Sequence, residues 1–336
     1  MLAIKQKRPR IIKTETPVIR DVAFYQDVVN GLTSEPKQLQ SKYFYDKEGD
    51  RLFQQIMNCS EYYPFQCELE IFSQQTEMLA NVIAKAGATA DLIELGAGDC
   101  TKTRYLLAEL VKMDTDFTYL PIDISENIID FLNAQLPLDI PGLKVNGITG
   151  DYLQMLGRAA DHSDNKKVVL FLGSNIGNMS PGEAAEFCMN LRQHLKPGDL
   201  VIIGVDLKKK PATILAAYND KAGITKEFNL NLLRRINREL GANFEITQFE
   251  HYPVYDPDTG GCKSYLISLK KQQVMIPCVD GSTWINFEEN EPMFMEISQK
   301  YSIKEIEELG RNAQFRPVAN FFDNKGWFMD TVWEAV

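Results

Sequence analysis

Residues 66–207 contain two kinds of segment that follow one another in turn. One kind has apolar residues at helical spacing, and the other is a short continuous apolar run typical of a buried strand. Because apolar strands regularly alternate with helices, the pattern predicts a parallel sheet covered by helices on both faces. Ser125 and Ser180 stand where helix N-caps are expected, the second in capping-box register with Glu183. The predicted helices are ELEIFSQQTEMLANVIAKA, TKTRYLLAELVKM, SENIIDFLNAQL and SPGEAAEFCMNLRQHL, and the predicted strands are ATADLIEL, FTYLPID, LKVNGITGD, KKVVLFLG and LVIIGVDL.

The pattern changes after Lys210-Pro211, where helical segments precede strand-like runs that flank a DPDTGG turn at 256–261. The tail from Ser302 predicts a helix and then two strands around a DNKG turn, an antiparallel close to the first sheet. We therefore expect a core of residues 66–207 completed by 300–336. The expected second domain is smaller and of the α+β class, formed by residues 208–299 and joined by residues 1–65.

Composition narrows the class of protein. With 44% hydrophobic and 24% charged residues the chain is an ordinary folded protein, and no apolar run approaches the ~20 residues of a membrane span. The N-terminus lacks the apolar stretch of a secretion signal, so we expect a cytoplasmic protein. We also expect a monomer that acts on a small molecule and not on a membrane. A net charge of −10 disfavours nucleic acid, although Lys5 to Arg10 form a basic cluster. The six cysteines are scattered without metal-ligand spacing, so we expect no metal site.

A glycine loop follows the first predicted strand, in LIELGAGDCTKTR at 92–104. Such loops let the backbone approach a cofactor beneath a helix N-terminus. A dinucleotide fingerprint needs G-x-G-x-x-G, and the third glycine is missing here, which disfavours a nicotinamide oxidoreductase.

S-adenosylmethionine (SAM) fits the loop better, because its amino acid end, ribose and adenine need separate polar partners. Acidic residues at successive strand ends can supply them on the edge where open α/β sheets bind ligands. Each residue alone could be an ordinary strand-end acid, but four such features together favour a cofactor site. The candidates are Glu94, Gly96, Gly98 and Lys102 for the amino acid end, Asp123 for the ribose, and Asp151 with the adjacent Tyr152 for the adenine.

From about residue 40 to the C-terminus, the sequence also resembles the SAM-dependent histidine Nα-methyltransferases, which make hercynine for ergothioneine biosynthesis. The resemblance implies a Rossmann-like class I SAM-dependent methyltransferase sheet with an inserted substrate-binding domain. The segments that carry it are KYFYDKEGDRLFQQIMNCSEYYP, ELGAGDCTKTR, PIDIS, FLGSNIGN, AAYND, LLRRINRELGANF, FEHYPVYDP and MEIS.

The same resemblance assigns an amino acid site. It implies that Glu296 and Ser298 hydrogen-bond the imidazole nitrogens of histidine, and that Tyr45 and Asn178 also orient the amine for catalysis. The implied substrate residues are Tyr45, Tyr62, Asn178, Tyr218, Glu296 and Ser298. One departure concerns CKSYLISL, where related enzymes place a methionine beside the substrate and this chain has Tyr265 after a longer loop. Tyr265 therefore joins the candidates for substrate binding.

The expected reaction is a displacement in which the substrate α-amine takes the methyl group of SAM, leaving S-adenosylhomocysteine, and which occurs three times on L-histidine. Two alternatives stay open. One is the same chemistry on another amine, such as tryptophan, tyrosine or a derivative, and Tyr265 leaves room for it. The other is a catalytically idle SAM-binding protein with a regulatory role.

Overall fold

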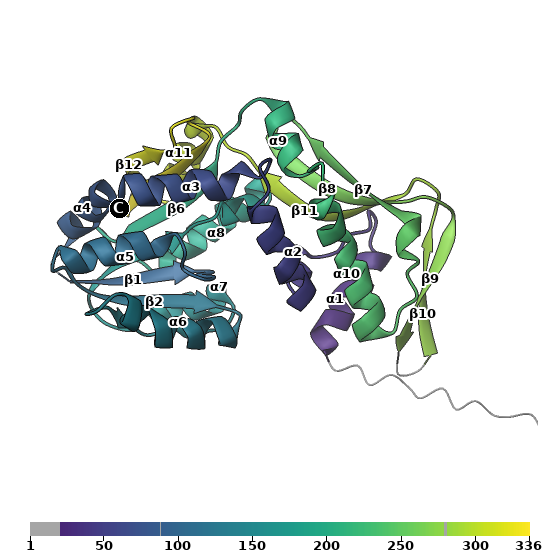
Figure 1. The fold of residues 1–336 in the computed structure, drawn as a ribbon, viewed down its shortest axis with the longest axis horizontal. Helices are drawn as coiled ribbons and strands as arrows, with labels where there is room; N and C mark the ends of the chain where they lie inside the picture. The colour runs from purple at the N-terminus through teal and green to yellow at the C-terminus, as the bar shows by residue number, and fades with distance from the viewer. Residues whose placement is uncertain (1–20, 88, 279–280) are drawn as a thin grey trace, which may run out of the picture. The chain divides into compact units, whose positions relative to one another are not determined.

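The structure is a computed structural model that describes residues 21–87, 89–278 and 281–336 (Figure 1). The basic cluster from Lys5 to Arg10 lies outside the described residues. The chain divides into two compact units. Unit 1 contains residues 21–52, Lys226–Tyr252 and Tyr265–Met295, and unit 2 contains Phe53–Thr225, Pro253–Ser264 and Glu296–Val336.

Unit 2 is built on an eight-stranded sheet in the order β12-β13-β6-β5-β1-β2-β3, in which β4 also pairs with β2. Strands β6, β5, β1, β2, β3 and β4 are parallel to one another. Strand β13 runs antiparallel to β6, and β12 runs antiparallel to β13. The predicted parallel sheet with an antiparallel close is therefore confirmed. The strands are β1 (Thr89–Leu95), β2 (Asp116–Asp123), β3 (Lys144–Val145), β4 (Ile148–Thr149), β5 (Lys166–Phe171), β6 (Leu200–Asp206), β12 (Phe315–Phe322) and β13 (Phe328–Ala335).

Helices cover both faces of this sheet, and each face has its own hydrophobic core. Side chains of α3, α4, α5 and α6 form one core, and side chains of α7, α8 and α11 form the other. Successive residues of β6 alternate between the two cores, as a strand buried on both faces requires. The helices are α3 (Tyr63–Gln74), α4 (Thr76–Ala86), α5 (Thr103–Lys112), α6 (Glu126–Asp139), α7 (Tyr152–Ala160), η2 (Asn175–Asn178), α8 (Pro181–Gln193), α9 (Pro211–Ala217) and α11 (Ile303–Asn312).

Two elements differ from the predicted pattern. The single helix predicted over 68–86 is divided into α3 and α4 at Gln75, whose side-chain amide donates to the carbonyl of Phe322 over 2.7 Å. The strand predicted over 143–151 is reduced to β3 and β4, because the backbone N–H of Gly147 donates to Asn133 Oδ1 rather than to a neighbouring strand. Both caps are confirmed, since Ser125 accepts from Ile128 and Ser180 forms a capping box with Glu183.

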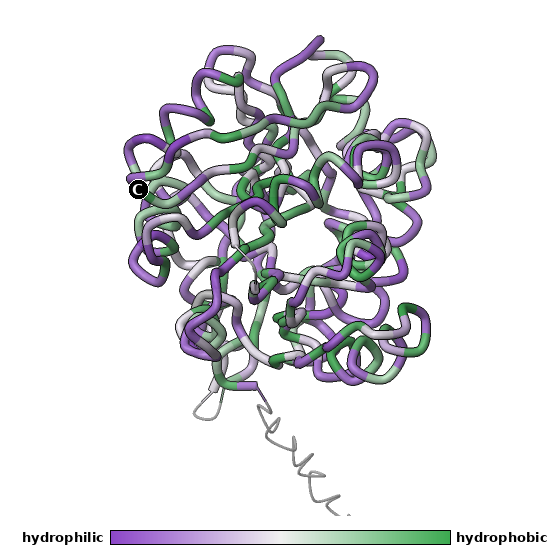
Figure 2. The backbone as a smooth tube through the Cα atoms, turned by 90° about the vertical axis from the view of Figure 1, so that its left-hand side faces the viewer, coloured by the Kyte–Doolittle hydropathy of each residue, from purple (hydrophilic) through white to green (hydrophobic). Residues whose placement is uncertain are grey.

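Unit 1 contains the two-stranded sheet β10-β9 and parts of the three-stranded sheet β11-β8-β7, whose strands contribute residues to both units. Figure 2 shows hydrophobic and hydrophilic stretches following one another closely along the backbone tube. The remaining elements are α1 (Val22–Thr33), η1 (Ser41–Phe44), α2 (Lys47–Met57), α10 (Ile224–Leu240), η3 (Ile246–Gln248), β7 (Phe249–Tyr255), β8 (Gly261–Ser268), β9 (Gln272–Cys278), β10 (Gly281–Phe287) and β11 (Pro292–Gln299).

The boundaries between the units lie elsewhere than the sequence pattern predicts. Residues 53–65 and 208–225 belong to unit 2, because Tyr63 of α3 and Ile214 of α9 are buried in its core. None of the helices in the described part of the chain is both long and apolar enough to cross a bilayer.

Candidate active site

Three loops meet at the carboxyl edge of the unit 2 sheet, where β1, β2 and β5 end. Gly96 and Gly98 have positive φ angles of 73° and 54°, a conformation that glycine adopts without strain. The N–H of Gly96 donates to the carbonyl of Ile122 at the end of β2 over 2.9 Å. A Cβ on Gly96 would lie 3.6 Å from the side-chain nitrogen of Asn175, which follows β5. The predicted glycine loop is thus enclosed between two neighbouring strand ends.

Asp123 is held in place at the end of β2. Its Oδ2 accepts from the N–H of Gly98 over 3.1 Å, and its Oδ1 accepts from the N–H of Ser125 over 2.9 Å. An ionised carboxylate has about four lone-pair sites, so each oxygen can accept a further hydrogen bond. This half-buried carboxylate therefore suits a diol such as that of ribose.

Asp151 and Tyr152 begin α7 on the same edge of the sheet. The N–H of Gly150 donates to the backbone carbonyl of Asp123 over 2.9 Å, which joins this segment to the end of β2. Asp151 is exposed and accepts from the N–H of Gln154. The Tyr152 ring packs 5.7 Å from that of Phe171, and burial raises the pKa of its hydroxyl. The pair thus presents an exposed acceptor beside an aromatic surface.

Glu94 lies beneath the glycine loop rather than on its surface. Only 3% of the residue is exposed, and its carboxylate accepts from Thr103 Oγ1 over 2.7 Å and from the hydroxyl of Tyr119. Burial raises the pKa of Glu94 to about 7. In this structure Glu94 therefore supports the loop from inside, and its predicted contact with a cofactor stays a prediction.

Lys102 pairs with a buried carboxylate that the sequence did not indicate. Its ammonium contacts Glu68 of α3, which is fully buried and also accepts from the N–H of Gly173 over 2.7 Å. A Cβ on Gly204 would overlap the Glu68 carboxylate, so this contact requires glycine in β6. Burial and the charge of Glu68 raise the pKa of the neighbouring Asp330 well above its usual range. Lys102 is thereby fixed between the loops after β1 and β5.

Four of the predicted substrate residues lie in a second group within unit 2. Glu296 and Ser298 are two residues apart on β11 and hence project from the same face. The hydroxyl of Tyr218 donates to Ser298 Oγ over 2.6 Å, and the Tyr218 ring lies 6.3 Å from the ring of Tyr62. Ser264 of β8 donates to Glu296 Oε1 over 3.0 Å. The structure thus gives the Glu296 carboxylate one hydroxyl donor and joins Ser298 of the same strand face to Tyr218.

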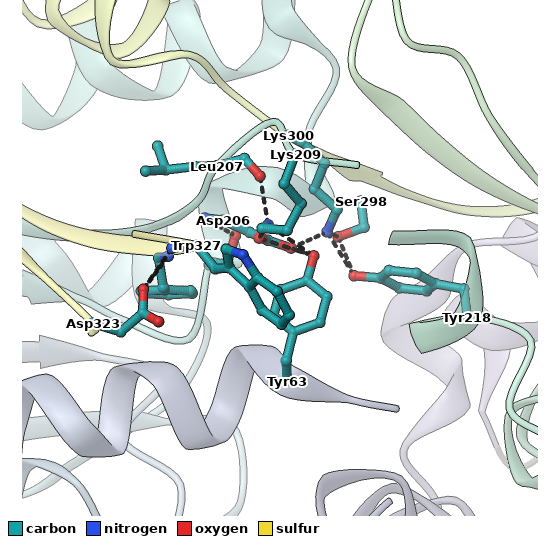
Figure 3. Close-up of polar contacts among 11 residues, drawn as sticks. Tyr63, Asp206, Leu207, Lys209, Tyr218, Ser298, Lys300, Asp323 and Trp327 are labelled. Atoms are coloured by element: carbon teal, nitrogen blue, oxygen red, sulfur yellow. Dashed lines mark hydrogen bonds and ion pairs between the residues drawn. The ribbon is translucent and has the colours of Figure 1, made fainter. Parts of the chain in front are cut away.

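Behind this group lies a charged network that sequence reasoning missed (Figure 3). Asp206, at the end of β6, pairs with Lys300 over 2.7 Å and with Lys209, and accepts from the hydroxyl of Tyr63. Lys300 is fully buried and donates to Tyr218 and Ser298 over 2.8 and 2.7 Å. Asp206 ends a predicted strand at the same sheet edge as Asp123, so the strand-end argument could have found it.

The three remaining candidates have other surroundings within their own units. Asn178 ends η2 and is exposed on unit 2. Tyr45 and Tyr265 belong to unit 1, where their rings lie 5.6 Å from Phe228 and 5.9 Å from Phe294. The roles predicted for these three residues stay predictions.

Comparison with known proteins decides the family. The sequence model of the SAM-dependent, histidine-specific methyltransferases matches residues 24–335, nearly the whole described chain. The chain belongs to this family. Its fold is therefore a class I SAM-dependent methyltransferase sheet, as predicted, and the protein is a SAM-dependent N-methyltransferase.

Relatives of this methyltransferase extend from bacteria to fungi. A histidine N-alpha-methyltransferase of Mycolicibacterium smegmatis is 36% identical over 83% of this chain and 84% of its own length. The ergothioneine biosynthesis protein 1 of Schizosaccharomyces pombe is 30% identical over 84% of this chain but only 37% of its own. A 4-dimethylallyltryptophan N-methyltransferase of Epichloe festucae var. lolii is 25% identical over 84% and 86% of the two chains.

Proposed function

We propose that this methyltransferase transfers methyl groups from SAM to the α-amine of L-histidine, three times in succession, giving trimethylhistidine (hercynine). The observation that carries the choice of histidine is the carboxylate of Glu296 beside the hydroxyl of Ser298 on one face of β11. A ring with two nitrogens can meet both groups, and a site with buried polar groups discriminates against a side chain that cannot pair with them.

The loops at the carboxyl edge fit SAM. Asp123 keeps free acceptor sites for the two ribose hydroxyls, as its two backbone donors use only part of its capacity. Asp151 is exposed beside the Tyr152 ring, which suits an adenine amine and base. Gly96 leaves room for a ligand against its backbone, since a Cβ there would meet one side-chain atom within 4 Å, that of Asn175. Lys102 lies next to this opening and suits the carboxylate of the amino acid end.

Methyl transfer from SAM does not require the protein to form a covalent bond with the substrate. SAM supplies a methyl group that is already activated by its attachment to a positively charged sulfur. In each transfer a nitrogen–carbon bond forms and a sulfur–carbon bond breaks, and the nitrogen releases one proton to solvent for each methyl group gained. The chain must therefore hold an unprotonated amine in line with the methyl group. We assign this orientation to Tyr45 and Asn178, whose neutral donors can also fix the substrate carboxylate. Tyr62 and Tyr218 are assigned to the same substrate site.

One relative carries ergothioneine biosynthesis in its name, and we propose that trimethylhistidine feeds the same pathway here. We also expect the enzyme to act as a cytoplasmic monomer on a small-molecule substrate. Gel filtration with light scattering, and fractionation of cells, would test the monomer and its compartment.

The proposal is tested by incubating the purified protein with SAM and an equimolar pool of the twenty amino acids, and measuring mass gains of one, two and three methyl groups. Trimethylated histidine as the main product supports it. Transfer to tryptophan or tyrosine would move the specificity to Tyr265 and its longer loop. SAM binding without transfer to any amine would favour the regulatory alternative.

A variant separates the imidazole contact from general damage. Glu296→Ala should lower kcat/KM for histidine by at least tenfold, because the substrate N–H loses an ionised acceptor. Glu250→Ala, an exposed change on β7 of the same three-stranded sheet, serves as the matched control and should leave activity unchanged. Full histidine activity in Glu296→Ala would remove the reason for choosing imidazole.

A further inference from the structure

The buried ammonium of Lys300 has three polar partners inside the protein. It lies 2.7 Å from Asp206 Oδ2, 2.8 Å from the hydroxyl oxygen of Tyr218 and 2.7 Å from Ser298 Oγ (Figure 3). An ammonium has donors and no acceptor, so Lys300 can only donate to the two hydroxyl oxygens, while it forms an ion pair with Asp206. The side chains of Lys300 and Asp206 are both fully buried, so each is a buried counter-charge of the other.

This arrangement fixes how the two hydroxyl groups can bond. Tyr218 and Ser298 both accept from Lys300 and share one hydrogen bond of 2.6 Å between their own oxygens. The two hydroxyls have two protons, and the shared bond uses one of them. A phenol is the stronger donor of the two, so Tyr218 donates to Ser298, as the contact geometry indicates. Both lone pairs of Ser298 are then occupied, and its own O–H is left to donate.

We infer that Lys300 and Asp206 are positioning residues that turn Ser298 into an obligatory donor, so that the site selects the neutral form of the imidazole ring. Ser298 donates to the unprotonated ring nitrogen, and Glu296 accepts from the protonated one. The inference rests on the proposed function, since it concerns the histidine side chain at that site. An imidazolium ion, with N–H groups on both nitrogens, would face Ser298 donor to donor.

Other titratable groups surround Tyr218 and Ser298. None of them would change the protonation of the ring nitrogens of bound histidine in the way that the inference predicts. Asp206 and Lys209 come from β6 and its following loop, Tyr63 from α3, and Cys262 from β8. Burial raises the pKa of Tyr63, Tyr218 and Cys262, so all three stay protonated near neutral pH. Burial lowers the pKa of Lys209 and raises that of Tyr255 on β7. The protonation state of the ligand must therefore be observed directly.

The decisive measurement is nitrogen NMR of ring-labelled ¹⁵N-histidine bound to the full protein with S-adenosylhomocysteine, at a pH about one unit below the ~6.5 of free imidazole. Free histidine is then mostly imidazolium. The bound ligand should show one protonated and one unprotonated ring nitrogen. Its dissociation constant should rise about tenfold more steeply per pH unit below 6.5 than just above it, because a proton lost by the α-amine contributes the same slope on both sides and only the imidazole adds to it below 6.5.

Two variants connect that signal to the network. Ser298→Ala removes the donor and should flatten the pH dependence of histidine binding. Lys300→Met removes the group that orients Ser298, and should weaken histidine binding at least tenfold while S-adenosylhomocysteine still binds. Lys304→Met, an exposed change at the start of α11, is the matched control for the loss of a lysine and should bind histidine normally. Ser298→Ala carries the test if Lys300→Met does not fold.

Bound histidine with both ring nitrogens protonated, or binding that is independent of pH in the parent protein, would overturn the inference but leave the methyltransferase intact. Failure to bind histidine while S-adenosylhomocysteine still binds would contradict the proposed substrate, and the inference would fall with it.

Discussion

Replacing Asp206 by asparagine should cost this protein about 3–5 kcal/mol of folding free energy, because it removes the carboxylate that pairs with two buried ammonium groups. The side chains of Asp206 and Lys300 are fully buried, and that of Lys209 is 6% exposed. The amide of the substituted side chain would still accept hydrogen bonds but would carry no charge. Both ammonium groups would then lose this counter-ion in a dry environment.

The assay is urea unfolding followed by circular dichroism, comparing the midpoints of the parent and Asp206→Asn at pH 7. Asp164→Asn is the matched control, because it removes one partner of the Lys196–Asp164 pair, whose side chains are 71% and 102% exposed. Solvent screens that pair, so the control should unfold at the parental midpoint. A loss below about 1 kcal/mol in Asp206→Asn would refute the reasoning, since water or a shifted protonation state would then be compensating the buried charges.

Three further predictions concern the cofactor edge. Gly204→Ala should destabilise the fold by about 1–3 kcal/mol in urea unfolding, because the new methyl group overlaps the buried Glu68 carboxylate, whereas Gly182→Ala, with nothing within 4 Å of its Cβ, should not. Asp123→Asn should weaken S-adenosylhomocysteine binding at least tenfold by calorimetry, and unchanged affinity would contradict its assignment to the ribose. Burial raises the pKa of Glu94 to about 7, above the ~4.3 of an unfolded chain, so its contribution to stability is present below pH 4 and is lost as pH rises to 7. Relative to Glu94→Gln, the parent should therefore lose roughly 3 kcal/mol over that interval, and parallel pH curves for the two proteins would count against it.

The sheet and its cofactor edge were predictable because a parallel sheet imposes a simple rule. Each strand is a continuous apolar run, and the loop after it lies on the ligand-binding edge. Gly96 follows such a run and Asp123 ends one, so their place in the fold could be deduced one strand at a time. Asp151 follows the two-residue strand β4, which pairs with β2. The same rule applies to Asp206 at the end of β6, where it was not used.

The side chains that contact the loop residues at this edge could not be deduced from strand ends. They lie on other elements, whose neighbours in space are determined by tertiary packing. Glu68 lies on α3, where the helical pattern marks it as one more polar position, and yet it is fully buried against Lys102 and Gly173. The one related feature of the sequence is Gly204, because a glycine within a strand can mark the close approach of another group, here the Glu68 carboxylate. Local sequence carries no signal for these contacts, because Lys102 is 34 positions and Gly173 is 105 positions away from Glu68 along the chain.

Lys300 shows most clearly why the chemistry of a site depends on such partners. The resemblance to histidine methyltransferases supplied Glu296 and Ser298 as polar residues, but a hydroxyl can donate or accept and its identity alone does not fix which. Whether Ser298 donates or accepts is decided by the residues that hydrogen-bond to its oxygen. Because Lys300, which pairs with Asp206, and Tyr218 both donate to Ser298, the hydroxyl facing the ligand can only donate. A buried ion pair can thus define which protonation state of a substrate is accepted, in addition to its effect on stability.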